Sequence, residues 1–441
     1  MQRIYTIDTT KKIEKKVLLK GWIQNVRNIG KLIFVSLRDG SGTVQVIVNE
    51  QVQKGIDVLK SEYAVEIIGT VKQRPASQGR ATVTGMIEIV AEKIRIISRA
   101  KELPFDVEAK ANIEAYLDYQ PFTLRSERSR AIFRFQSEIV NAFRSFLRKQ
   151  RFVEFQAPNF VPSATEGGAN VFPVKYFDHT AYLSQSPQFY KQIMVGIFER
   201  VYTITKAFRA EEHATSRHLN EYSTLDFEMG FIRNHTDVMA MENRLLSYMM
   251  QFLEKTCAHE LQLLGARLPQ VPKKIPSLKL RQAQKIIQQE FGEDCTQEPD
   301  LSPQHERWIC DYAAKQYNSE FIFITHYPTK KRPMYTFPDP KNPDYTYSFD
   351  LLFRGLEITT GGQRIHDYDQ LLANIKAWGN NPKYFSFYLQ AFQYGMPPEG
   401  GLAIGLERLT AQLLGLENVK EATLFPRDQN RIDVLLSKLH S

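Results

Sequence analysis

The chain has 441 residues, of which 43% are hydrophobic and 24% are charged, with a formal net charge of +8. This length and composition predict two or three globular domains. Because no apolar stretch approaches the roughly 20 residues of a membrane-spanning helix, and the opening MQRIYTIDTTKKIEKK lacks the apolar core of an export signal, we expect a cytoplasmic protein without membrane contact. The three cysteines, Cys257, Cys295 and Cys310, lie far apart without metal-ligand spacing, which predicts reduced packing residues.

The excess positive charge belongs to the N-terminal segment. Residues 1–102 hold 18 Lys and Arg against 10 Asp and Glu, so the rest of the chain is neutral. A basic module beside a neutral body favours a polyanionic partner, since Lys and Arg displace counterions from phosphates. A merely basic surface is the alternative that charge alone leaves open.

The same segment reads as five short strands. The runs VLLKGWIQNV, LIFVSLRDGSGTVQVIVNE, YAVEIIGTVKQR, ATVTGMIEIVAE and KIRIIS are rich in β-branched residues and are punctuated by turn residues. Five strands in about a hundred residues are typical of a small closed barrel of the oligonucleotide-binding (OB) type. Phe34 and Gln45 would face outward beside Arg27 and Arg38, and would offer a stacking surface and a hydrogen-bonding group for bases. Phe34 could equally belong to the core.

Residues 103–128 lack strand alternation and contain two prolines, which predicts a hinge. The stretch 129–152 then repeats apolar residues at helical spacing and predicts a long amphipathic helix. The extended segment VEFQAPNFVPS follows, interrupted by Pro158 and Pro162. A helix leading into such an edge strand can form a dimer contact, although core packing explains the helix equally well. Residues 255–320 predict a small helical insertion whose role the sequence does not indicate.

Two stretches after residue 164 combine flexible backbone with polar side chains. TEGGANVFPV resembles a mobile lid, because paired glycines let the backbone flex while Glu166 reaches a substrate amine. YLSQSPQFYKQ places Ser186, Gln188 and Lys191 at a turn and the start of a helix. A single lysine on a helix usually lies on the solvated surface, so only its neighbours make Lys191 a candidate.

The runs RVYTITKAFRAE and NEYSTLDFEMGFI both alternate apolar and polar residues and predict an antiparallel hairpin joined by EHATSRHL. Arg209, Glu211, Glu221 and Asp226 could share one face of this hairpin, with further cations in the loop. Burying so many charges without a ligand would be costly. Arginine pairs bidentately with phosphate or carboxylate, so the pattern favours a triphosphate and an amine bound together. A surface hairpin with salt bridges is the alternative.

Two further stretches carry candidate ligands for phosphate and metal. In SFDLLFRGLEITTGGQRIH, Glu357 and Thr360 precede a Gly-Gly turn and Arg364, and they offer oxygen ligands to a magnesium ion carried by phosphates. In GGLAIGLERLTAQLLG, a glycine-rich strand containing Gly405 leads into a helix that presents Arg408 in its first turn. Such a helix start favours nucleotide phosphates.

Together, FRAEE…RHLNEY…DFE, GLAIGLERL, QSPQFYKQ and GLEITTGGQRIH resemble class II aminoacyl-tRNA synthetases, specifically aspartyl-tRNA synthetases of the archaeal and eukaryotic type. The resemblance extends over essentially the whole chain. It implies an α+β protein with an N-terminal OB-fold anticodon-binding barrel (1–102), the hinge, and a class II catalytic domain (129–441) built on a six- or seven-stranded antiparallel sheet flanked by helices. The implied reaction uses ATP and Mg²⁺ to activate L-aspartate and to charge tRNA-Asp, and the implied assembly is a homodimer.

The resemblance also implies roles for individual residues. Arg209, Arg408 and Glu357 would be catalytic. ATP would be bound by Arg209, Glu211, Arg217, His218, Tyr222, Glu357, Thr360, Gly405 and Arg408, with Mg²⁺ on Glu357 and Thr360. Aspartate would be bound by Glu166, Ser186, Gln188, Lys191, Arg209, Asp226 and Arg364. The anticodon would be contacted by Arg27, Phe34 and Gln45.

Three alternatives remain open at this stage: an asparaginyl-tRNA synthetase, an aspartate-amidating ligase that uses no tRNA, and a non-catalytic RNA-binding relative. RIH after the Gly-Gly turn and KKRPMY favour the aspartyl pattern, and the intact basic barrel argues against the ligase. Gln24 lies where relatives vary with tRNA choice, so charging of tRNA-Asn is undecided. Ala403 stands where many archaeal relatives have glycine, a change that leaves the strand possible.

Overall fold

A computed structural model describes residues 1–56, 58–75, 83–109, 112–163, 170–212 and 215–432. The chain divides into two compact units, Met1–Asp106 and Val107–Ser441. No described helix is long and apolar enough to cross a membrane.

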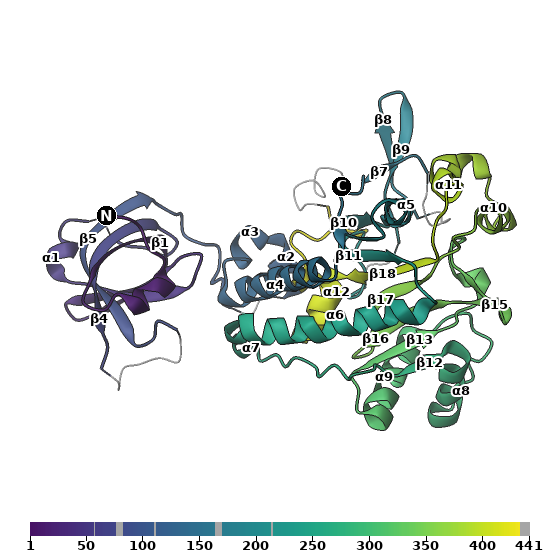
Figure 1. Ribbon diagram of the computed structural model, residues 1–441. Helices are drawn as coiled ribbons and strands as arrows, with labels where there is room; N and C mark the ends of the chain where they lie inside the picture. The colour runs from purple at the N-terminus through teal and green to yellow at the C-terminus, as the bar shows by residue number, and fades with distance from the viewer. Residues whose placement is uncertain (57, 76–82, 110–111, 164–169, 213–214, 433–441) are drawn as a thin grey trace. The chain divides into compact units, whose positions relative to one another are not determined.

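The first unit is a closed five-stranded barrel in the order β1-β2-β3-β5-β4 (Figure 1). Its strands are β1 (Lys16–Ile29), β2 (Leu32–Arg38), β3 (Thr43–Val48), β4 (Ala64–Gln73) and β5 (Ile87–Ser98), with a short 3-10 helix η1 (Thr6–Lys11) and a helical turn α1 (Glu50–Gln53). Alternate residues of each strand point inward, and the core is built from aliphatic side chains such as Leu19, Val35, Val46 and Ile67.

The barrel confirms the predicted OB-type fold, and two of the predicted runs are divided differently. The run 32–50 contains two strands, β2 and β3, because Asp39 closes the turn between them by accepting hydrogen bonds from the backbone of Ser41 and Gly42. The last two runs join in one strand, β5, whose register shifts at a bulge opposite Ile68 and Gly69. A bulge lets a long strand bend around a small barrel.

The second unit is built on an eight-stranded sheet in the order β12-β13-β16-β17-β18-β11-β10-β6. Its strands are β6 (Val153–Glu154), β10 (Arg200–Phe208), β11 (Glu221–Gly230), β12 (Ser277–Lys279), β13 (Phe321–Thr325), β16 (Ser348–Phe353), β17 (Leu356–Gln363) and β18 (Glu399–Gly405). The six inner strands are antiparallel, whereas β6 and β12 each pair in parallel with their neighbour. The sheet is therefore mixed and wider than the expected six or seven antiparallel strands.

The edge strands account for that difference. β6 has two residues and lies in the segment predicted as an extended edge strand. β12 has three residues, and a run this short shows no alternation that a sequence could reveal. Two smaller sheets complete the unit: β7 (Phe160–Val161), β9 (His179–Leu183) and β8 (Pro173–Tyr176) in one, β14 (Pro338–Asp339) and β15 (Asn342–Thr346) in the other.

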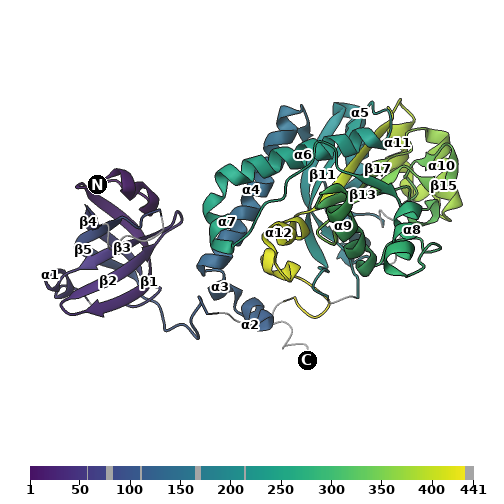
Figure 2. The ribbon, with the colours of Figure 1, turned by 90° about the horizontal axis from the view of Figure 1, so that it is seen from below.

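Helices cover the sheet in separate groups, as Figures 1 and 2 show. They are α2 (Ile113–Asp118), α3 (Gln120–Thr123), α4 (Glu127–Lys149), α5 (Gln188–Phe198), α6 (His235–Thr256), α7 (Ala258–Leu264), α8 (Leu280–Phe291), α9 (Pro303–Tyr317), α10 (Tyr368–Ala377), α11 (Ser386–Phe392) and α12 (Leu406–Leu414), with the 3-10 turns η3 (Thr329–Lys331), η4 (Pro382–Phe385) and η5 (Val419–Ala422). The largest apolar cluster joins α4, α6 and α12 to one face of the sheet.

The long helix lies where its apolar spacing predicts it. Ile132, Phe135, Ile139 and Phe143 are fully buried in the largest cluster, and the Ser126 hydroxyl accepts from the backbone N–H of Ser129, which caps the first turn. Core packing therefore accounts for this face of α4. The three cysteines are buried and form no disulfide, as predicted.

The segment 103–128 crosses the boundary between the two units and contains α2 and α3. The Gln120 side chain donates to the carbonyl of Thr423 and accepts from the N–H of Phe425, so α3 is fastened to the C-terminal segment. The stretch 255–320 contains α7, β12, α8 and α9. Helices α8 and α9 pack on β13 through Ile309 and neighbouring apolar residues (Figure 2).

Candidate active site

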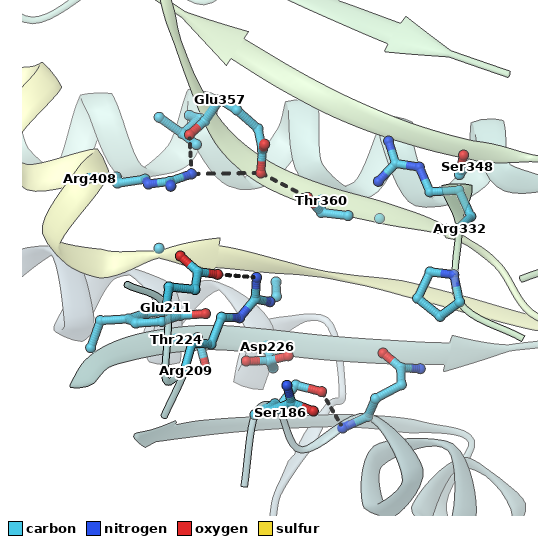
Figure 3. A pocket seen from close by; sticks show the side chains of 18 of the residues that line it. Ser186, Arg209, Glu211, Thr224, Asp226, Arg332, Ser348, Glu357, Thr360 and Arg408 are labelled. Carbon is cyan, nitrogen blue, oxygen red and sulfur yellow. Dashed lines mark hydrogen bonds and ion pairs between the residues drawn. The ribbon is translucent and has the colours of Figure 1, made fainter. Parts of the chain in front are cut away.

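A cavity of about 420 Å³ opens in the second unit above β11, β17 and β18 (Figure 3). It is lined by every described residue that the sequence analysis assigned to ATP, metal or aspartate. These are Ser186, Gln188, Lys191, Arg209, Glu211, Arg217, His218, Tyr222, Asp226, Glu357, Thr360, Arg364, Gly405 and Arg408. Glu166 and the predicted lid around it lie outside the described residues. Because Arg209 and Arg408 line one cavity, a single ligand can reach both.

The hairpin of β10 and β11 supplies one wall. Its strands pair from Arg200 opposite Met229 to Phe208 opposite Glu221, as the alternation predicts. Just beyond β10, Arg209 lies 3.8 Å from Glu211, and its guanidinium carbon is 5.9 Å from the ring of Tyr222. Figure 3 shows Arg209 and Glu211 on the wall that faces Arg408.

Glu221 does not share this face, contrary to our expectation. It is not among the lining residues and instead lies 3.7 Å from Lys206. Strand alternation explains the difference, because Tyr222, Thr224 and Asp226 occupy the even positions of β11 and an odd position points the other way.

The opposite wall is the junction of β18 and α12. Gly405 ends the strand in an extended conformation and Arg408 lies in the first turn of the helix. The buried carboxylate of Glu407 accepts from the backbone N–H of Ser223 at 2.9 and 3.0 Å, which fastens α12 to β11. This contact fixes the first turn of α12, which carries Arg408, on the wall opposite Arg209.

Glu357 and Thr360 lie on β17 beside Arg408. The Thr360 hydroxyl donates to Glu357 Oε1 at 2.9 Å, and Arg408 Nη1 donates to the Glu357 carbonyl at 3.2 Å. No group of three or more His, Cys, Asp and Glu side chains suited to a metal occurs in the described part of the chain. One carboxylate and one hydroxyl fit the way Mg²⁺ binds in nucleotide sites, where phosphate oxygens and water complete its shell.

Arg217 reaches the same end of the cavity from the loop between β10 and β11. Its Nη2 donates to the carbonyl of Gly355 at 2.7 Å, and its Nη1 donates to Glu306 at 3.4 Å. His218 Nδ1 lies 2.6 Å from the hydroxyl of Thr215. Burial lowers the pKa of Arg217 below its ordinary value, against the attraction of Glu306.

The C-terminal segment supports the middle and the end of this loop. The N–H of Val419 donates to the carbonyl of Ser216, and the N–H of Asn220 donates to the carbonyl of Arg427, at 3.0 and 2.9 Å. The loop is thus held by backbone contacts while its cationic side chains face the cavity.

At the amino-acid end, charges are buried and paired. Lys191 Nζ lies 3.0 Å from Asp226 Oδ1, 3.2 Å from Glu228 Oε2 and 3.1 Å from the carbonyl of Leu402. Arg364 Nε donates to Glu228 Oε1 at 2.8 Å, so one carboxylate joins both cations. Burial raises the pKa of Asp226 although Lys191 attracts its charged form. Asp226 Oδ2 is buried without a hydrogen-bond partner among the described residues, which suits a ligand amine.

Backbone close to this network leaves no room for a side chain at Gly401. A Cβ atom there would lie 2.2 Å from Glu228 Oε2 and 2.1 Å from the carbonyl oxygen of Phe227. Glycine is therefore required for β18 to pass over the carboxylate.

A second layer holds the start of α5. Gln188 Nε2 donates to Gln192 Oε1 at 3.0 Å, and Gln192 Nε2 donates to Glu399 at 2.6 Å. Burial, with the charge of Glu228, raises the pKa of Glu399 to about 8. The Ser186 hydroxyl accepts from the N–H of Gln188 and lies at the cavity edge.

Sequence reasoning missed four charged residues that shape the cavity. Glu228 belongs to the quoted DFE motif, and its spacing of two from Asp226 would have placed it on the same face. Arg332 lies in the quoted KKRPMY and lines the cavity, where it pairs with buried Asp350 at 2.5 Å. Burial raises the pKa of Asp350 to about 6 against that attraction. Glu306 comes from the segment 255–320, whose role the sequence does not indicate.

The predicted anticodon residues lie on the outer face of the barrel. Arg27 pairs with Phe34 between β1 and β2, and Gln45 lies on β3 opposite Ser36. Phe34 is half-buried and points away from the core side chains, so it is not a core residue. Arg38 differs from our expectation, because it is buried and its Nη2 contacts both oxygens of Glu62.

These features define an enzyme class that holds a nucleotide against a small ionised metabolite and carries a barrel suited to nucleic acid. Residues 112–429 match the family described as tRNA synthetases class II (D, K and N), and residues 17–97 match the OB-fold nucleic acid binding domain. Since the first match covers more than half of the chain, the protein belongs to the class II tRNA synthetase family.

Named relatives match nearly the whole chain. The chain is 44% identical to the aspartate–tRNA(Asp/Asn) ligase of Deinococcus radiodurans, over 98% of this chain and 99% of that protein. It is 38% identical to the aspartate–tRNA(Asp) ligase of Pyrococcus horikoshii, over 97% and 98%. Among solved structures, asparaginyl-tRNA synthetase from Pyrococcus horikoshii complexed with asparaginyl-adenylate matches with a TM-score of 0.90 at 31% identity, over 98% of this chain and all of that one.

Proposed function

We propose that this protein is an aspartate–tRNA ligase, which activates L-aspartate with ATP and transfers it to the 3′ end of tRNA-Asp. The observation that carries the proposal is the buried pair Lys191 and Arg364 at one end of a cavity whose other end presents Arg209 and Arg408. The names of the relatives support the same reaction.

The reaction needs no nucleophilic side chain. A carboxylate oxygen of aspartate attacks the α-phosphorus of ATP, a new P–O bond forms, and pyrophosphate leaves. Arg209 stabilises the charge that develops on the α-phosphate, while Arg217 and Arg408 bind the outer phosphates. A ribose hydroxyl of the terminal adenosine of tRNA then attacks the aspartyl carbonyl, and AMP leaves. The chain contributes position and electrostatic stabilisation.

Glu357 and Thr360 would hold Mg²⁺ together with phosphate oxygens of ATP. The ion supplies charge neutralisation on the polyphosphate when it is bound. Glu211 and Tyr222 would lie against the adenine, the first accepting a hydrogen bond and the second stacking on the ring. The Gly405 backbone lets the phosphates approach the start of α12.

Two cations select aspartate over asparagine. Lys191 and Arg364 place two positive charges at this end, which attract a second carboxylate of the ligand and not a neutral amide. The N–H₂ of an amide also cannot accept hydrogen bonds from them. A site built on such pairing rejects the wrong analogue by orders of magnitude. Asp226, Ser186 and Gln188 would bind the ammonium group and backbone of aspartate.

The test is pyrophosphate exchange with aspartate and with asparagine. Wild type should exchange with aspartate alone, and Lys191→Met, assayed below its melting temperature, should lose that activity. Because Lys191 pairs with buried Asp226 and Glu228, the melting temperature of the variant should fall as well. Unchanged exchange in the variant would remove Lys191 from the site. Exchange supported by asparagine would favour the asparaginyl reaction. This reaction is the second candidate because a solved asparaginyl-tRNA synthetase structure matches the chain.

The barrel would bind the anticodon through Arg27, Phe34 and Gln45. Arg27 is exposed and lies beside Phe34 across two strands, which suits a phosphate next to a stacked base. Gln24 lies at a bulge between Ile23 and Asn25, where a side chain is redirected out of the regular ladder. Phe34→Ala should weaken charging about tenfold through KM for tRNA and leave pyrophosphate exchange unchanged.

The protein would charge tRNA-Asn as well as tRNA-Asp. Relatives named for both tRNAs are 38–44% identical to this chain, and relatives named for tRNA-Asp alone are 37–40% identical. The ranges overlap, and the two relatives at 44% identity are both named for the two tRNAs. Aminoacylation of both transcripts at one stated salt concentration tests this, because ionic strength alone changes the affinity for tRNA. Charging confined to tRNA-Asp would restrict the function to one tRNA.

We further propose a cytoplasmic homodimer that uses the edge of the catalytic sheet. The edge strand β6 has an exposed Val153, and the neighbouring small sheet exposes Phe160, Tyr176 and Phe177. The ring centroids of Phe160 and Tyr176 are 5.9 Å apart, and those of Tyr176 and Phe177 are 5.1 Å apart. An exposed apolar cluster of this kind marks an interface. Light scattering after size exclusion measures the mass directly, and a monomeric mass would contradict the proposal.

A further inference from the structure

Glu306 lies behind the nucleotide end of the cavity, on the first turn of α9. It comes from the segment 255–320, far in sequence from the other residues of the site. The hydroxyl of Ser302 accepts from the N–H of His305, and His305 Nδ1 accepts from the N–H of Ser302, so the start of α9 is capped from both sides. Ile309 and Cys310 anchor the same helix in the apolar cluster on β13.

The Glu306 carboxylate makes two contacts with groups of the site. Its Oε2 accepts from Arg217 Nη1 at 3.4 Å and from the backbone N–H of Glu357 at 3.2 Å. Only 13% of the side chain is exposed. Glu306 therefore joins the loop that carries Arg217 to the strand that carries Glu357.

A bulge in β17 explains why the backbone of Glu357 needs a side-chain partner. The pairing of β16 with β17 shifts between Leu351 and Leu352, which lie opposite Thr359 and Glu357. A bulge withdraws backbone groups from the ladder, and buried backbone groups must then find other partners. Here Glu306 accepts from the N–H of Glu357, and Arg408 donates to its carbonyl.

The turn next to this bulge also fits against α9. Arg354 and Gly355 have φ of 48° and 80°, and a Cβ atom on Gly355 would lie 2.8 Å from the side chain of Arg307. The carbonyl of Gly355 accepts from Arg217 Nη2. Two groups therefore hold the guanidinium of Arg217. One is the Gly355 carbonyl, in the turn between β16 and β17, and the other is the Glu306 carboxylate on α9.

We propose that Glu306 is a positioning residue for the activation reaction, which fixes Arg217 for the outer phosphates of ATP and Glu357 for the bound metal. The inference rests on the proposed roles of Arg217 and Glu357. A long arginine on a loop loses much conformational freedom when it binds phosphate. A partner that fixes it beforehand removes that cost from ATP binding.

The experiment compares Glu306→Gln and Glu306→Ala with the matched control Asp311→Asn, an exposed acid on the same helix. Glutamine keeps an acceptor for the Glu357 N–H but loses the ion pair, whereas alanine loses both. We expect Glu306→Gln to raise the KM for ATP about fivefold and Glu306→Ala about thirtyfold, with the larger loss of alignment in alanine. Only Glu306→Ala should also raise the Mg²⁺ concentration needed for half-maximal exchange. The KM for aspartate should not change in either Glu306 variant. Asp311→Asn should have the wild-type KM for ATP.

Binding measurements separate this role from a structural one. Calorimetric affinity for ATP and for inorganic pyrophosphate should fall in both Glu306 variants, while affinity for AMP stays unchanged because AMP lacks outer phosphates. In an Arg217→Ala background, Glu306→Gln should have almost no further effect on ATP. An unchanged or lower KM for ATP, an equal loss for AMP, or full additivity with Arg217→Ala would overturn the inference.

The same measurements keep the inference apart from the proposed function. If wild type shows no exchange with aspartate but binds ATP, the proposed function fails and the ATP affinities of the variants still decide the role of Glu306. If either substitution prevents folding, Glu306→Asp takes its place, because the shorter carboxylate should raise the KM for ATP and lower pyrophosphate affinity without removing the charge. A variant Glu306→Asp with wild-type affinities contradicts the inference.

Discussion

The two ends of the cavity differ in how deeply their charged side chains are buried and in how fully these charges are paired. At the amino-acid end, the side chains of Lys191, Asp226 and Glu228 are 2% exposed or less, and each is joined to an opposite charge. At the nucleotide end, the side chains of Arg209 and Arg408 are 40% and 31% exposed. One end is buried and already paired, and the other keeps cations in contact with solvent.

The difference follows from what each end would bind. A triphosphate brings several charges and leaves as pyrophosphate, so its arginines must bind and release within each turnover. Aspartate differs from asparagine by one group, and discrimination needs donors whose positions do not adjust to the wrong ligand. Fixed partners at the amino-acid end provide that rigidity, at the expense of buried charge that must stay paired.

The largest effect should come from Glu228→Gln, which removes the carboxylate shared by Lys191 and Arg364. Two buried cations would lose their common partner, and breaking a buried pair costs about 4 kcal/mol of folding free energy. We expect a large loss of stability in urea denaturation together with loss of aspartate-dependent exchange. The control Glu221→Gln, on the same strand but only partly buried, should change stability by less than about 0.5 kcal/mol. Equal stability of the two variants would remove the contrast between the two ends.

Arg408→Ala tests the other end. The arginine lines the cavity and holds the carbonyl of Glu357, yet it is about a third exposed, so its loss should hardly change the melting temperature. Removing one group that stabilises developing charge costs about 3 kcal/mol in activation. We expect kcat/KM for ATP to fall about a hundredfold in pyrophosphate exchange. Arg233→Ala, at an exposed arginine just before α6, is the control. A stability loss as large as that of Glu228→Gln would contradict the comparison.

The sequence predicted the residues of the nucleotide end better than the contacts of the amino-acid end. Arg209 and Arg408 stand in motifs with a distinctive local order, and the hairpin and helix that carry them follow from alternation and a glycine-rich strand. Glu228 was visible within DFE, but a carboxylate in a strand gives no sign of which cations it will meet. Its partners come from α5 and from the end of β17, and only the packed sheet brings them together.

Glu306 shows where a sequence offers no signal. Nothing in SPQHERWIC marks an acid for the active site, because its role depends on how α9 docks on β13 and on a bulge in β17. The edge strand β12 was missed for a similar reason, since three residues cannot show a period, whereas β6 lies in the segment that was predicted as an extended edge strand. The barrel, by contrast, was predicted closely, because its turns and alternation are local properties.

A pH experiment sharpens the comparison from the buried end. Burial raises the pKa of Glu399 to about 8, above the 4.5 of an exposed glutamate. The folded protein therefore holds a proton that the unfolded chain releases between these values. Its stabilising contribution is fully present below pH 4.5 and is lost as pH rises toward 8.

Glu399→Gln should remove this dependence. We expect wild type to lose on the order of 2 kcal/mol between pH 5 and 8 relative to the variant, measured by urea denaturation across that range. Glutamine cannot titrate, and it keeps an oxygen for the Gln192 amide that now contacts Glu399. The exposed Glu417→Gln should leave the wild-type slope unchanged. A variant with the same slope as wild type would show that Glu399 is charged in the folded protein.

The smallest effect should come from Thr360→Val, at the exposed end. The substitution keeps the shape of the side chain and removes the hydroxyl that donates to Glu357 Oε1 at 2.9 Å. Thr360 is exposed, so the melting temperature should be unaffected. If Glu357 and Thr360 hold the metal together, losing one oxygen and the bond that orients the other should raise the Mg²⁺ requirement for exchange about tenfold.

The comparison with Thr256→Val, an exposed threonine at the end of α6, shows whether that shift belongs to the site. Excess Mg²⁺ should restore the rate of Thr360→Val, because weaker metal binding is overcome by concentration whereas a misplaced arginine is not. Restoration would separate metal binding from the alignment that Arg408 provides. A rate that stays low at saturating Mg²⁺ would show that Thr360 aligns the phosphates, as Arg408 does, and does not only bind the metal. The nucleotide end would then also depend on fixed side-chain positions, like the buried end.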